Sequence, residues 1–240
     1  MLQKSFCRLA LFIVIFAWVS TTLAAAAGTA ASGLSDSGTF RISVAGKEIG
    51  TERFRILPSG NNIIAKADIE FQTQKAGKLL ELQSFPELLL DSRLRPLSYT
   101  WAQKGAQNSK LRIDFTTAPV KAQYHTVNGK NDERDFALPA DVVVLDDNAL
   151  DQYEILVALY DKTSGGQQTF NAFIPQEALP GQVQVVATGN EQVRIGGESE
   201  SLRHFVVATD LARIDLWTDP QGHLERVSVP AMRFNAIRQK

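Results

Sequence analysis

Residues 147–161 read Asp-Asn-Ala-Leu-Asp-Gln-Tyr-Glu-Ile-Leu-Val-Ala-Leu-Tyr-Asp, and this stretch decides the fold. It is the one convincing helix in a chain whose other segments alternate apolar and polar residues as strands do. One helical stripe is apolar or aromatic, and it consists of Leu150, Tyr153, Leu156, Val157 and Tyr160.

The second half of this segment is apolar on its other side too, at Ile155, Ala158 and Leu159. A helix that is apolar nearly all round is buried on more than one side. Asp147 or Asn148 can cap its start, and Asp151 lies near the positive end of the helix dipole. We therefore predict a helix over residues 148–160 that lies like a plug inside a curved sheet.

Two series of strands flank the helix, with turn signals about every 8 to 12 residues, as in antiparallel sheets. Phe40, Ile42 and Val44 begin the first hairpin, and a change of parity after Ile49 predicts a bulge near Gly50. The predicted fold is mainly β: a curved antiparallel sheet or half-barrel with one central buried helix, over residues 36–240 as a single domain. The pattern leaves open whether the two strand series form one sheet or two stacked sub-domains.

The first 24 residues have the pattern of a secretory signal peptide. Lys4 and Arg8 precede an apolar run over residues 9–19, and small residues allow cleavage between positions 24 and 27. Residues 25–35 are mostly Ala, Gly, Ser and Thr, which predicts a flexible N-terminus for the exported chain. The expected location is therefore periplasmic or extracellular.

Composition excludes several kinds of chemistry. The one cysteine, Cys7, lies inside the predicted signal, so the exported chain has no disulfide, thiolate metal site or cysteine nucleophile. Lys4 and Arg8 are the only charges before Ala24, so removal of the signal changes the net charge from -1 to -3. Nucleic-acid binding gains no electrostatic support. No later apolar run is long enough for a stable membrane span.

The sequence also lacks a recognisable catalytic or metal-binding set. Its three histidines, His125, His204 and His223, do not have the spacing of metal ligands, and no nucleophile elbow or phosphate-binding loop is present. His204 is the most interesting because it shares the apolar parity of its strand, although a satisfied structural histidine is the simpler interpretation. We expect no enzyme activity, no metal and no cofactor.

Aromatic residues provide the best candidates for a binding site. Tyr99 and Trp101 share one face of a predicted strand, while Tyr153 and Tyr160 share the helical stripe with Leu156. Ordinary core packing can explain such a set. The functional interpretation is an apolar pocket between sheet and helix, with a few polar groups, lined by these five residues.

Residues 214–230 resemble the closing hairpin of a family of uncharacterised exported bacterial proteins. The shared pattern is roughly W-x-D-x-x-G-x-L-x-R-V, here from Trp217 to Val227, and the opening hairpin around Gly46 and Gly50 is also similar. That family is similar in outline to periplasmic lipoprotein carriers, whose incomplete barrel holds helices in its concave face. The resemblance implies a half-barrel and a lipid-like ligand, and it implies no catalytic residue.

Three functional hypotheses follow. The first is a periplasmic binding or carrier protein for an apolar or lipid-like ligand, which needs an apolar cavity beside Tyr153 and Leu156. The second is a structural or interaction module of the cell envelope, which needs an exposed, uncharged sheet edge or an apolar patch for an envelope partner. The third, ranked lowest, is a hydrolase, which needs His204 within hydrogen-bond reach of a carboxylate in a cleft.

Overall fold

The computed structural model describes residues 33–240 except 76–77, 106–107, 126–128, 130 and 210–211. The predicted signal peptide (1–24) and most of the predicted flexible segment (25–35) lie outside the described residues. In the part that is described, no helix is long and apolar enough to cross a bilayer.

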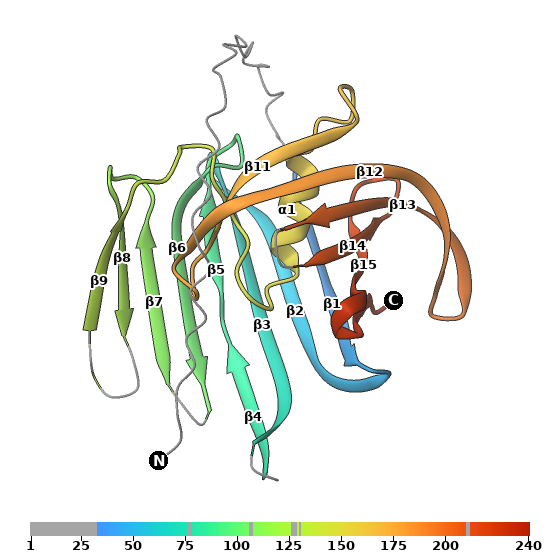
Figure 1. Ribbon diagram of the computed structural model, residues 1–240, viewed down its shortest axis with the longest axis horizontal. Helices are drawn as coiled ribbons and strands as arrows, with labels where there is room; N and C mark the ends of the chain where they lie inside the picture. The colour runs from blue at the N-terminus through green and yellow to red at the C-terminus, as the bar shows by residue number, and fades with distance from the viewer. Residues whose placement is uncertain (1–32, 76–77, 106–107, 126–128, 130, 210–211) are drawn as a thin grey trace, which may run out of the picture.

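Strands make up most of the described chain, and one α-helix lies between two series of them (Figure 1). The first series is β1 (Asp36–Val44), β2 (Lys47–Ser59), β3 (Asn62–Lys75), β4 (Lys78–Ser84), β5 (Glu87–Leu90), β6 (Pro96–Lys104), β7 (Ser109–Asp114), β8 (Val120–His125) and β9 (Asn131–Phe136). After β10 (Val143–Val144) and α1 (Asp151–Leu159), the second series is β11 (Gln167–Ile174), β12 (Leu179–Ile195), β13 (Glu198–Ala208), β14 (Arg213–Thr218), β15 (Leu224–Val229) and β16 (Phe234–Arg238), with a short 3-10 helix, Pro230–Met232, before β16.

The two series form one continuous sheet of 16 strands. Its order is β10-β11-β12-β13-β14-β15-β16-β1-β2-β3-β4-β6-β7-β8-β9, and β5 pairs with β3 and β6. The two series join where β16 pairs with β1, with Ile42 opposite Ala236. All described pairings are antiparallel except that between β10 and β11. The prediction of a mainly β fold with a large, curved, antiparallel sheet is confirmed.

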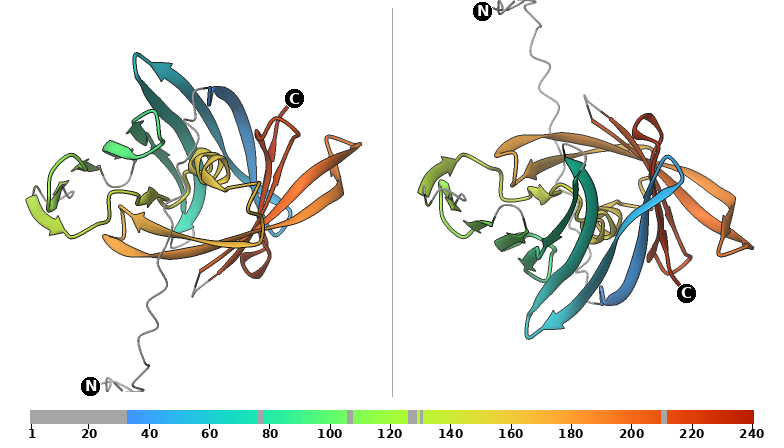
Figure 2. Two further views of the ribbon diagram at one scale, coloured as in Figure 1. Left: turned by 90° about the horizontal axis from the view of Figure 1, so that it is seen from above. Right: turned by 90° about the horizontal axis from the view of Figure 1, so that it is seen from below.

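The sheet curls around α1, as the two end-on views in Figure 2 show. Residues 137–142 connect β9 to β10, which are the two ends of the strand order. Contacts also join these ends: the rings of Phe136 and Phe173 are 4.8 Å apart, and the Tyr124 hydroxyl donates to Pro175 O at 3.1 Å. The helix therefore lies in the concave side of the sheet.

Successive side chains of each strand point to opposite faces of the sheet, and the apolar ones on the concave face form the core with the helix. Phe40 on β1 stacks on Phe54 of β2 with ring centroids 5.3 Å apart, and both side chains are buried. On α1, Ile155, Leu156 and Val157 are all buried in the same cluster. Burial on successive helical positions confirms that α1 is covered on more than one side.

The predicted bulge is present beside Gly50. Ile42 pairs with Gly50 but Ser43 pairs with Glu48, so Ile49 is the extra residue on β2. A Cβ atom at Gly50 would lie 2.0 Å from the backbone oxygen of Glu70 on β3. Glycine is therefore required here because the neighbouring backbone comes too close for any side chain.

The helix is shorter than predicted, and its cap is different. It begins at Asp151 and ends at Leu159, with Leu150 and Tyr160 as the flanking cap residues. The prediction that Asp147 or Asn148 caps the start is wrong, because Leu150 occupies the N-cap position and no side-chain cap comes from it. Asn148 instead has a φ of 65° in the turn that precedes the helix.

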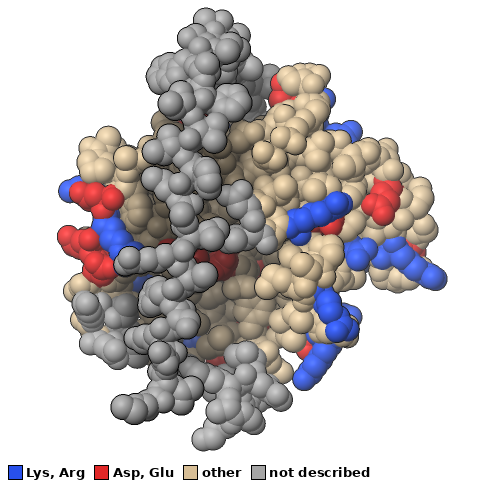
Figure 3. Space-filling view, in the orientation of Figure 1, with Lys and Arg blue, Asp and Glu red and all other residues tan. Residues whose placement is uncertain are grey.

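Charged side chains are unevenly spread on the described surface. On the face shown in Figure 3, they gather at the two sides of the molecule, over the β7–β9 end and over the β12–β13 hairpin. The edge strand β9 alone carries Asp132, Glu133, Arg134 and Asp135. Such charges oppose pairing with another strand.

Candidate functional site: a cavity beside the helix

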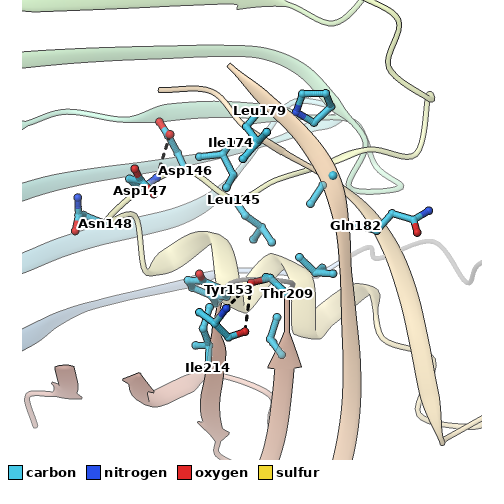
Figure 4. A pocket seen from close by; sticks show the side chains of 16 residues that line it. Leu145, Asp146, Asp147, Asn148, Tyr153, Ile174, Leu179, Gln182, Thr209 and Ile214 are labelled. Carbon is cyan, nitrogen blue, oxygen red and sulfur yellow. Dashed lines mark hydrogen bonds between the residues drawn. The ribbon is translucent and has the colours of Figure 1, made fainter. Parts of the chain in front are cut away.

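A cavity of about 500 Å³ lies between α1, the segment that precedes it, and strands β11–β14. Figure 4 shows it from close by. Its volume falls within the range of about 300–1,000 Å³ that is usual for small-molecule sites. The 16 lining residues are Leu145, Asp146, Asp147, Asn148, Tyr153, Ala172, Ile174, Leu179, Pro180, Gly181, Gln182, Val183, Val207, Thr209, Ala212 and Ile214.

Most of the lining is apolar because these strands turn their concave-side residues towards the cavity. Ala172 on β11, Val183 on β12 and Val207 on β13 are all buried and come from neighbouring strands. Leu179 is different, since it exposes 46% of its surface although it lines the cavity. An exposed leucine beside an internal apolar space indicates where the cavity meets solvent.

Asp146 is the buried acid of the lining. Its carboxylate accepts a short hydrogen bond from the Tyr99 hydroxyl and another from the backbone N–H of Gln176 at 3.0 Å. Its own backbone N–H donates to Gln152 Oε1 on α1 at 2.6 Å. Burial raises the pKa of Asp146 to about 6, and the hydrogen bond from Tyr99 opposes that rise.

Asp147 is the exposed acid of the lining. Burial of part of its side chain and the neighbouring Glu177 carboxyl group both raise the pKa of Asp147. Tyr153 on α1 lies across from this segment in Figure 4, and burial raises its pKa to about 12 with a smaller contribution from Asp147. The polar groups of the cavity are thus acidic or neutral.

The start of α1 is capped from a distant strand. The carboxylate of Glu52 on β2 accepts hydrogen bonds from the backbone N–H groups of Leu150 and Asp151, both at 2.8 Å. Glu52 is completely buried, and burial together with the negative Asp151 raises its pKa. Burial also raises the pKa of Asp151 to about 7, and its Oδ1 has no hydrogen-bond partner among the described residues.

A second buried acid ties the helix to strand β15. Glu154 accepts a hydrogen bond from the backbone N–H of Leu224 at 2.9 Å. Burial first, and then the nearby Asp36 carboxylate, raise the pKa of Glu154 to about 9. Asp36 on β1 in turn binds Arg238 on β16 at 2.6 Å.

Sequence reasoning missed these buried acids. For Glu52, the alternation of the strand could have indicated burial, because Glu52 shares the core-facing positions of β2 with Phe54 and Ile56. Asp151 and Glu154 are three residues apart on α1, so they lie on neighbouring positions of one helical face.

The structure separates the five predicted lining residues. Tyr153 lines the cavity, and Tyr99 contacts it indirectly through Asp146. Leu156 is fully buried in the core, away from the lining. Tyr160 packs edge-on against Phe205 at 5.4 Å and donates to Gly166 O at 2.6 Å. Trp101 lines a smaller hollow of about 210 Å³ with Tyr124 and His125.

His204 lies on the face of the sheet that points away from α1. Its Nε2 is 3.0 Å from Asp215 Oδ1, its Nδ1 is 2.8 Å from Thr188 Oγ1, and its ring stacks on Trp217 at 4.7 Å. These partners fully account for a structural histidine on a sheet surface, and none of the four residues lines the cavity beside the helix. Within the described residues, no group of three or more His, Cys, Asp or Glu is placed to hold a metal ion.

Fold and site together define a mainly β protein whose curved sheet encloses one helix and a largely apolar cavity. No protein-family model matches the chain, and no curated protein matches it. Among solved structures, it is similar to a DUF1089 family protein from Pseudomonas aeruginosa, with 12% identity and a TM-score of 0.45 over 75% of this chain and 90% of that one. That protein belongs to a family of unknown function.

Proposed function

We propose that this protein binds or carries an apolar or lipid-like small molecule in the cavity beside α1. The observation that carries the proposal is a space of about 500 Å³ lined mainly by apolar side chains, with a few polar groups among them. Binding sites for small apolar molecules have this composition, because buried area provides affinity and a few polar groups fix orientation.

We propose further that the protein works outside the cytoplasm, in association with the cell envelope. The support is the signal-like pattern of residues 1–24 and an exported chain without cysteine. An interaction module that pairs through a sheet edge has less support, because β9 is strongly charged and β10 is only two buried residues long.

Gly181 offers a way to close the cavity without disturbing the backbone. It lies on β12 at the same parity as Val183, so a side chain there points into the cavity. A Cβ atom at Gly181 would meet nothing within 4 Å. Gln184 on the same strand is exposed and points to the opposite face, so Gln184→Phe adds the same ring outside the cavity.

The test is calorimetric titration of purified protein with 1-decanol, an uncharged single-chain probe. The wild type and Gln184→Phe are expected to bind one decanol with equal affinity, whereas Gly181→Phe is expected to bind at least about tenfold more weakly. Absence of binding to the wild type, or equal binding by Gly181→Phe, would overturn the proposal.

A further inference from the structure

The charged residues that line the cavity are all acidic. Of the 16 described residues that line it, Asp146 and Asp147 carry carboxyl groups and none is Lys, Arg or His. Glu177 adds a third carboxyl group next to Asp147. We infer that the natural ligand is a single-chain amphiphile with a cationic head, of which a primary alkylamine is the simplest example. This inference rests on the proposed function.

The acidic groups are positioned for a head group, and the apolar groups are positioned for a tail. In Figure 4, Asp146, Asp147 and Asn148 lie together on one side of the cavity, and Leu145, Ile174, Leu179 and Ile214 line other parts of it. Asp147 is exposed, so a polar head beside it keeps contact with solvent while the chain enters the apolar part. An ammonium group can then donate to Asp147 or to the neighbouring Asn148 side chain.

Among the described residues around the cavity, the start of α1 could attract an anion, but its N–H groups already have a partner. The start of a helix presents free N–H groups and a partial positive charge, which commonly bind carboxylates or phosphates. At α1 the Glu52 carboxylate accepts from the N–H groups of both Leu150 and Asp151. A fatty acid or anionic lipid would therefore meet carboxylates at the cavity without a compensating cation in its lining.

Buried Asp146 reinforces this preference. It is 3% exposed and is held by the Tyr99 hydroxyl and the Gln176 N–H, so its position is fixed before any ligand enters. Burial raises the pKa of Asp146 to about 6 in spite of these donors, so the ionised form that prevails at neutral pH gains stability from a nearby cation. A second negative charge beside Asp146 would raise its pKa further, whereas a cation would lower it.

The experiment compares three probes with the same chain: decylamine, 1-decanol and decanoate, titrated at neutral pH into wild-type protein and Asp147→Asn. The Asp147 side chain is exposed and its charged neighbour is the Glu177 carboxyl group, so asparagine fits there and the variant is expected to fold normally. Decylamine is expected to bind about tenfold more tightly than decanol, and decanoate more weakly than decanol. In Asp147→Asn the advantage of the amine is expected to shrink, and decanol binding to stay unchanged.

Salt provides a second readout, because added salt is expected to weaken the binding of decylamine and to leave that of decanol unaltered. Equal affinity for all three probes, tighter binding of decanoate, or an equal loss for amine and alcohol in Asp147→Asn would overturn the cationic head while leaving the apolar site in place. Failure of all three probes to bind would instead overturn the proposed function itself.

Discussion

The Oε1 atom of Glu52 lies 2.8 Å from the backbone nitrogen of Asp151, which places a strand side chain at the start of the central helix. Its other oxygen, Oε2, accepts from the N–H of Leu150 at the same distance. One carboxyl group therefore satisfies two helical N–H groups that α1 leaves without partners.

Glu52→Gln is expected to lower the free energy of unfolding by about 1–3 kcal/mol, because a glutamine amide can accept only one of the two hydrogen bonds. Urea denaturation followed by circular dichroism measures the loss. Glu48→Gln on the same strand is the control, since its partner Arg41 is exposed and such pairs contribute at most about 1 kcal/mol. Equal stability of the two variants would show that the Glu52 cap does not hold the helix.

Stability is expected to fall as the pH rises through the neutral range. The folded state raises the pKa of Glu154 from 4.5 to about 9, so between these values the folded chain keeps a proton that the unfolded chain has lost. Rising pH then favours unfolding, by up to about tenfold in the equilibrium constant per pH unit for each such proton. Glu154→Gln keeps the acceptor for Leu224 N–H and should flatten this dependence. A profile of unchanged slope in the variant would contradict the assignment.

Tyr99→Phe removes the hydroxyl that donates to Asp146. Because that hydrogen bond opposes the effect of burial, the pKa of Asp146 should rise above its present value of about 6. A raised carboxyl pKa destabilises the ionised form, so the variant should lose more stability at pH 7.5 than at pH 4.5. Denaturation curves at the two pH values check the direction, and carbon NMR titration of the Asp146 carboxyl reports its pKa. An equal loss at both pH values would be the contrary result.

Gly50→Ala is expected to destabilise the β2–β3 pair by about 1–3 kcal/mol, since the added methyl group would collide with the Glu70 backbone oxygen and force the strands apart. Gly181→Ala is the matched control, because its added methyl group enters open space. Thermal denaturation of both variants measures the difference. Similar melting temperatures would mean that the bulge at Gly50 relaxes without cost.

Local sequence patterns predicted the architecture because they depend on nearby residues. Alternation identified β1 to β3, the parity change located the bulge at Gly50, and the apolar stripe identified α1. The same reasoning placed the cap at Asp147 or Asn148, since it considered only adjacent residues. The actual cap, Glu52, is 98 positions from Leu150 and reaches it only because β2 lies beneath the helix.

The candidate site was harder to predict because it depends on which strand faces pack against α1 and where that packing leaves space. Tyr153 lines the cavity, but Val207 and Ile214, which line it too, come from strands far away in sequence. Leu156, on the same helical stripe, points into solid core instead. Sequence periodicity identifies a buried face but does not show where packing leaves space.

The most direct measurement of the central claim is native mass spectrometry of protein purified from bacterial envelope without detergent, followed by solvent extraction and mass analysis. The account predicts a small apolar molecule bound to wild-type protein and to Gln184→Phe, and its loss from Gly181→Phe. Wild-type protein that carries no such molecule, or a Gly181→Phe variant that retains it equally, would contradict the claim that the cavity beside α1 is a binding site.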